Sequence, residues 1–112
     1  MTDADRMAVI DRQIPAVWMV RTFLKHADES EDDEDLRGIV RDLYDFILAV
    51  GPVDADTDPT AYVKTARKKI GKLRRASEFY ADIRAEVSGH TNFKMAADCL
   101  TEAVARIGDA LD

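Results

Sequence analysis

The sequence predicts an all-α protein, folded as an antiparallel up-down-up-down four-helix bundle. Apolar residues recur at helical spacing along the chain, and no stretch alternates as a strand does. Short polar connections separate four amphipathic segments, which is the pattern of an antiparallel bundle. The length of 112 residues suffices for one core, so we expect a single domain over residues 1–112.

The first predicted helix runs from near Asp3 to around His26. Pro15 lies inside it and removes a backbone hydrogen bond, so we expect a kink there or a second helix start. Residues 14–24 are apolar on most sides of this helix, which is typical of a helix in a core or an interface.

Three large side chains in this segment, Trp18, Met19 and Phe23, cannot all face one neighbouring helix. At 100° per residue, Met19 and Phe23 lie opposite Ile14 and Trp18. We therefore predict an interface at these three residues, used for self-association as a homo-oligomer or for binding a protein partner.

Arg21 shares the arc of Trp18, and a buried guanidinium needs a carboxylate partner. We expect either a structural ion pair or a stem that reaches solvent, and a functional arginine is the alternative. The acidic residues available as its partner are Asp42, Asp45, Asp98 and Glu102.

Residues 28–35 carry a charge of −7 and are expected to stay solvated. Ser30 and Asp33 resemble a capping box for the second helix, predicted from about Leu36 to Val50. The run lacks the glycine turn of a calcium loop, so no metal site is predicted. The expected buried stripe of this helix is Leu36, Ile39, Val40, Leu43, Ile47 and Val50, widened by Tyr44 and Leu48.

The third helix is the longest and organises the bundle. Asp58-Pro59 is a helix start, because Asp caps free N–H groups and Pro fits the first position. Ser88-Gly89 is the predicted stop, with Gly89 in the left-handed conformation. Its apolar stripe is Tyr62, Ala66, Leu73, Ala76, Tyr80, Ile83 and Val87, with Val63 and Ile70 at the edge.

Residues 58–87 also hold eight of the sixteen basic residues. The basic face, which is a solvated surface or an electrostatic contact, comprises Arg67, Lys68, Lys72, Arg74 and Arg75, with Phe79 as an exposed aromatic. The acidic run at residues 28–35 is one expected partner of this face. Nucleic acid is the other, although the net charge of −6 disfavours it.

The last helix is predicted to begin at a Thr91 or Asn92 cap and to return antiparallel. Cys99 lies at the edge of its apolar stripe, which favours a buried structural thiol. A single cysteine excludes an internal disulfide.

The sequence holds no glycine-rich phosphate loop and no nucleophile with a neighbouring base, so a non-catalytic interaction module without cofactor is favoured. An alternative is carried by two spacings: Arg84 and His90 have five residues between them, and Arg21 and His26 have four. This spacing resembles the Arg-His motif of the HEPN group of helical-bundle RNases. The resemblance implies a nucleic-acid-binding bundle in which His is the general base and Arg holds the phosphate.

No signal pattern opens the chain, and no apolar run approaches the length of a membrane span. The sequence therefore predicts a cytoplasmic protein with no membrane contact.

Overall fold

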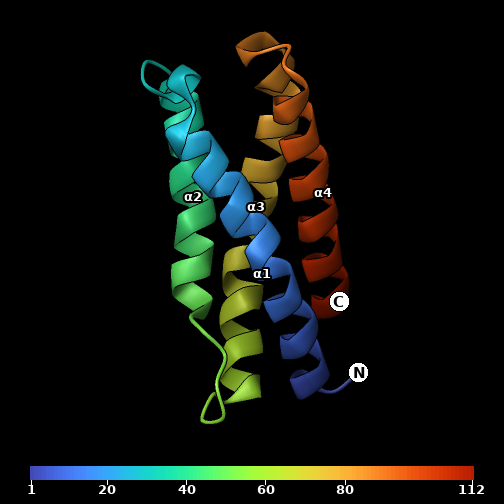
Figure 1. The fold of residues 1–112 in the computed structure, drawn as a ribbon. Coiled ribbons are helices and arrows are strands. Elements are labelled where there is room, and N and C mark those ends of the chain that lie inside the picture. Colours follow the sequence, from blue (N-terminus) through green and yellow to red (C-terminus); the bar gives the residue numbers. More distant parts are fainter.

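The computed structural model describes all 112 residues and consists of four helices without a strand (Figure 1). Consecutive helices run antiparallel along a body of 41 × 20 × 19 Å. The predicted all-α four-helix bundle is therefore confirmed. The helices are α1 (Asp3–His26), α2 (Glu34–Val50), α3 (Pro59–Val87) and α4 (Thr91–Leu111), and a 3-10 turn, η1 (Asp28–Ser30), precedes α2.

Side chains cap the starts of the helices. Thr2 and Asp5 form a capping box at α1, with both hydrogen bonds at 3.1 Å. Asp58 accepts a hydrogen bond from the Thr60 N–H at 3.0 Å, and Pro59 takes the first helical position, as predicted.

The start of α2 differs from the prediction. Asp33 caps it by accepting from the Leu36 N–H at 3.1 Å. Ser30 instead belongs to η1, where its buried hydroxyl donates to the Leu24 carbonyl at the end of α1. The predicted capping box at Ser30 is wrong, because this hydroxyl pairs with the preceding helix.

The connection between α3 and α4 also differs. Ser88 ends α3 in an extended conformation, and Gly51 is the only residue with a positive φ, at 71°. The prediction of a left-handed Gly89 is therefore wrong. The extended chain brings His90, rather than Thr91 or Asn92, to the cap of α4, where its Nδ1 accepts from the Asn92 N–H at 3.0 Å.

α1 is continuous through Pro15, so the predicted second helix start does not occur. Figure 1 shows the ribbon of α1 changing direction near its middle. The lower half of α1 runs beside α4, and its upper half leans toward α2. Of the four contacts around the ring of helices, the contact between α1 and α2 is the least extensive.

All four helices contribute to one core cluster of 24 buried apolar residues. The apolar stripe predicted for α3 faces this core. The buried Tyr80 hydroxyl donates to the Phe93 carbonyl at 2.9 Å, which joins α3 to α4. Phe46, which the predicted stripe of α2 omits, is 2% exposed. None of the helices combines the length and the apolar character needed to cross a bilayer.

Candidate functional site

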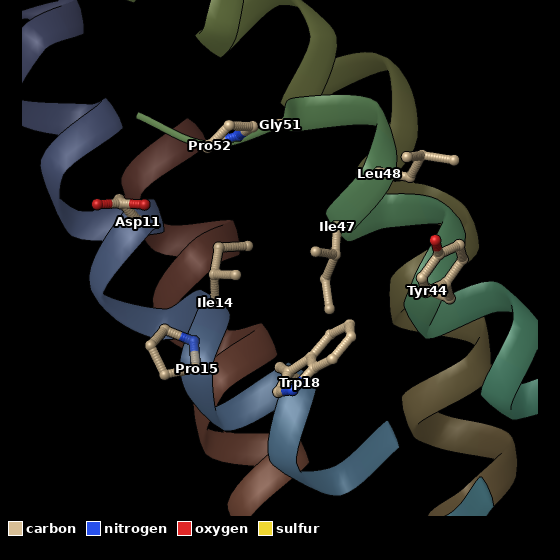
Figure 2. Close-up of a pocket in the computed structure, with 9 residues that line it drawn as sticks. All are labelled: Asp11, Ile14, Pro15, Trp18, Tyr44, Ile47, Leu48, Gly51 and Pro52. Carbon is tan, nitrogen blue, oxygen red and sulfur yellow. The ribbon is translucent and has the colours of Figure 1, made fainter. Parts of the chain in front are cut away.

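A groove lies between α1 and α2, toward the end of the bundle where the N-terminal half of α1 diverges from α2. Its volume is about 560 Å³. Figure 2 shows Ile14 and Ile47 pointing toward each other across it, with the Trp18 ring at one end. We call this the α1–α2 groove; its lining residues are Asp11, Ile14, Pro15, Trp18, Tyr44, Ile47, Leu48, Gly51 and Pro52.

The Trp18 end of the groove is held by a stack of three side chains. The Arg21 guanidinium carbon lies 4.6 Å from the centroid of the Trp18 ring and 5.0 Å from that of Tyr44. The two ring centroids are 6.4 Å apart, at 44° to each other. A cation over two ring faces is attracted by both quadrupoles, so this stack fixes the aromatic rings on the rim.

The predicted carboxylate partner of Arg21 is not found, because none of the ion pairs of the chain includes this residue. Its Nε is buried and has no acceptor within the chain. The aromatic rings cover the cation instead, and this coverage depends on the tertiary contact with α2.

The rim of the groove leaves large apolar side chains in solvent. Trp18 is 40% exposed, Tyr44 is 38% exposed and Leu48 is 66% exposed. Met19, outside the groove lining on α1, is 64% exposed. The prediction that Tyr44 and Leu48 widen the buried stripe of α2 is wrong. The apolar face of α2 is wider than its contact with the core, so these two side chains remain at the surface.

The structure separates the three residues predicted for the interface. Trp18 and Met19 lie at the surface, whereas Phe23 is half-buried and packs against Phe93 of α4, with ring centroids 5.0 Å apart. Phe23 is thus part of the internal packing of α1 on α4. Sequence reasoning missed Tyr44 and Leu48 as surface residues, although the excess width of the α2 stripe is a signal of them.

The chemistry available in the groove is limited. Asp11 and Tyr44 are its only ionisable lining residues, and no hydroxyl or thiol nucleophile lies beside a base. No group of three or more His, Cys, Asp or Glu side chains converges to hold a metal ion. Such a lining is suited to binding apolar groups.

Two members of the basic face are engaged within the chain. Lys72 contacts Asp45 at 3.1 Å and Asp42 at 3.3 Å, and these hydrogen bonds, that to Asp45 first, raise the pKa of its ammonium group. The Arg67 Nε donates to the Leu111 carbonyl at 3.1 Å, where the C-terminal end of α4 favours a cation. The other predicted members, Lys68, Arg74, Arg75 and Phe79, are exposed.

The predicted ion pairing between residues 28–35 and Arg67–Arg75 is not found. No member of the acidic run lies within ion-pair distance of a basic residue, and the carboxylates that approach α3 come from the middle of α2. The run leads into the start of α2, where the helix dipole favours acidic side chains.

The four residues of the RNase-like spacings lie toward one end of the bundle, where α1 and α3 end and α4 begins (Figure 1). The Nδ1 of His90 is occupied by the α4 cap, and Arg21 is stacked on the two aromatic rings. His26 is exposed and Arg84 is half-buried. The side chains of Arg21 and His90 therefore already have roles in the fold.

Cys99 is exposed, which corrects the predicted buried thiol. On α4 the buried arc is filled by neighbouring Leu100, Ala96 and Ala103, so a residue at the edge of the stripe turns outward.

Comparison of the chain with models of protein families, with curated proteins and with solved structures finds no match. The fold defines the class, an antiparallel four-helix bundle, and the α1–α2 groove is the feature from which a function is argued.

Proposed function

We propose that this protein is a non-catalytic interaction module that binds a protein partner through the α1–α2 groove. The observation that carries the proposal is the stack of Arg21 on Trp18 and Tyr44, which holds two aromatic rings half-exposed beside an apolar hollow. Trp, Tyr and Arg are enriched among the few residues that contribute most of the binding energy at protein interfaces. Their side chains are already ordered here, so binding costs little further side-chain entropy.

The groove supports protein binding better than catalysis. Two isoleucines form its centre. Its lining holds one carboxylate, Asp11, and one phenol, Tyr44, and no other titratable side chain. A protein partner that fills the hollow removes the exposed parts of Trp18 and Leu48 from water together. Burying apolar area of this kind stabilises a complex at any salt concentration.

Photo-crosslinking from within the groove tests this proposal. Leu48 is replaced by benzoylphenylalanine, and the matched control carries the same group at Met95, which is 49% exposed on α4. We expect adducts with protein from position 48 and not from position 95, in the purified sample or in an extract of the source cells. Equal yields from the two positions, or none from position 48 in either sample, contradict the proposal.

A second candidate function is nucleic-acid contact through the basic face. The observation that favours it is the row of exposed cations on α3, Lys64, Lys68, Arg74 and Arg75, none of which has an ion-pair partner. Binding of this kind weakens steeply as salt rises, because phosphate contacts release counterions. Salt-independent binding of single-stranded RNA, or none at about 0.05 M salt, rejects this candidate.

A further inference from the structure

The α1–α2 groove has charged residues at both ends of its α1 edge. Asp11 lines one end, and Arg21 covers the Trp18 ring at the other. The ten-residue separation corresponds to about 15 Å along the helix axis. These two charges of opposite sign therefore flank the apolar centre of the groove on the same helix.

Neither charge has a partner within its own chain. The ion pairs of the chain involve Arg6, Lys72, Lys94 and Arg106, and none of them reaches Asp11 or Arg21. Asp11 is exposed, and the buried Nε of Arg21 has no acceptor. No carboxylate forms an ion pair with the Arg21 guanidinium and no cation forms one with Asp11, and a second copy carries both groups on the same surface.

A two-fold axis between two copies would relate these groups. When two copies of α1 lie antiparallel and cross between Ile14 and Trp18, which line the groove halfway between residues 11 and 21, each Asp11 lies opposite the partner's Arg21. A parallel arrangement places like charges together, which is unfavourable.

The apolar rim is self-complementary under the same axis. Each copy offers a protruding side chain, Leu48, and a hollow lined by Ile14, Ile47 and Pro52 on one face. Only a closed, isologous contact lets both copies use the protrusion and the hollow at once. A head-to-tail contact leaves one exposed groove at each end.

We propose that the α1–α2 groove is the contact between two copies of this chain, arranged antiparallel about a two-fold axis between Ile14 and Trp18, with Asp11 of each copy paired with Arg21 of the other. This inference rests on the proposed function, because it names the partner that the groove binds.

Mixing two charge-reversed variants tests the arrangement. In Asp11→Arg the residues opposite each other are both basic, and in Arg21→Glu they are both acidic. Each variant alone is expected to dimerise at least about tenfold more weakly than the wild type at 0.05 M salt, because like charges face each other twice. An equimolar mixture restores two opposite-charge pairs, so native mass spectrometry shows a mixed dimer with affinity near that of the wild type.

A wild-type dimer with weakened variants and a restored mixture supports the two-fold contact. Variants that dimerise as tightly as the wild type, or a mixture that stays monomeric although both variants are folded by circular dichroism, overturn it. A monomeric wild type also overturns it, and adducts from position 48 with another protein then leave the proposed function standing.

A charge-independent variant covers the case in which Arg21→Glu loses its fold. On a Cys99→Ser background, Pro15→Cys places a thiol on the exposed groove lining close to the axis, where it meets the same residue of the partner. Its oxidation to a covalent dimer is expected to be at least about tenfold faster than that of the control Ala85→Cys, on an exposed position of α3. Equal rates for the two variants contradict the proposed axis.

Discussion

Replacing Trp18 with Ala is expected to weaken association through the α1–α2 groove by about 30-fold, which is about 2 kcal/mol. The substitution removes the aromatic ring from the end of the groove and leaves Arg21 with only the Tyr44 ring as cover. The measurement is sedimentation velocity over a dilution series of the purified protein, which yields the dissociation constant of the dimer.

The control for this prediction is Phe79→Ala on α3. Phe79 is 42% exposed and Trp18 is 40% exposed, so the two substitutions remove similar amounts of exposed aromatic surface. Phe79 lies on the basic face, away from the groove lining. If Phe79→Ala weakens association as much as Trp18→Ala, the binding surface is not the groove.

Two Tyr→Phe substitutions are expected to change stability in opposite directions. Tyr80→Phe removes the donor to the Phe93 carbonyl and leaves that buried acceptor unpaired, which costs about 1–2 kcal/mol of unfolding free energy. Tyr62→Phe removes a buried hydroxyl that no protein atom pairs with, so it is expected to raise stability by up to about 1 kcal/mol. Urea titrations at pH 7 measure both, and equal losses for the two variants contradict this account.

The same tyrosines predict a loss of stability at alkaline pH. Burial raises the pKa of each phenol to about 12, and the charge of Asp11 adds to the effect at Tyr62. Since the unfolded phenols titrate near 10, the folded state binds their protons more tightly. Stability is therefore complete below about pH 10 and falls between about pH 10 and 12, by up to about 3 kcal/mol for each tyrosine. The Tyr62→Phe, Tyr80→Phe double variant is expected to lose this slope in urea titrations from pH 9 to 11.

The helical bundle could be predicted because its signals are local. Asp58-Pro59 and the apolar stripe of α3 each depend on residues within a few turns, and the structure retains them. The caps at Ser30 and His90 could not be placed in this way. Ser30 pairs with the preceding helix, and His90 caps α4 because the three-residue connection is extended.

The candidate site could be predicted only in part, because it depends on how far the N-terminal half of α1 diverges from α2. Trp18 and Met19 were identified from the excess of apolar residues in α1. The exposure of Tyr44 and Leu48 follows from the divergence of the two helices, which no single helix encodes. Arg21 was expected beside a carboxylate, but its cover comes from Trp18 on its own helix and Tyr44 on the next.

The solution mass of the purified wild-type protein shows whether two copies associate. Multi-angle light scattering at about 0.05 M and 0.5 M salt compares two conditions in which screening differs severalfold. We expect a dimer of about 25 kDa, twice the 12.5 kDa of the chain, at both salt concentrations, because apolar burial in the groove is not screened. A mass of 12.5 kDa at both concentrations contradicts the two-copy contact.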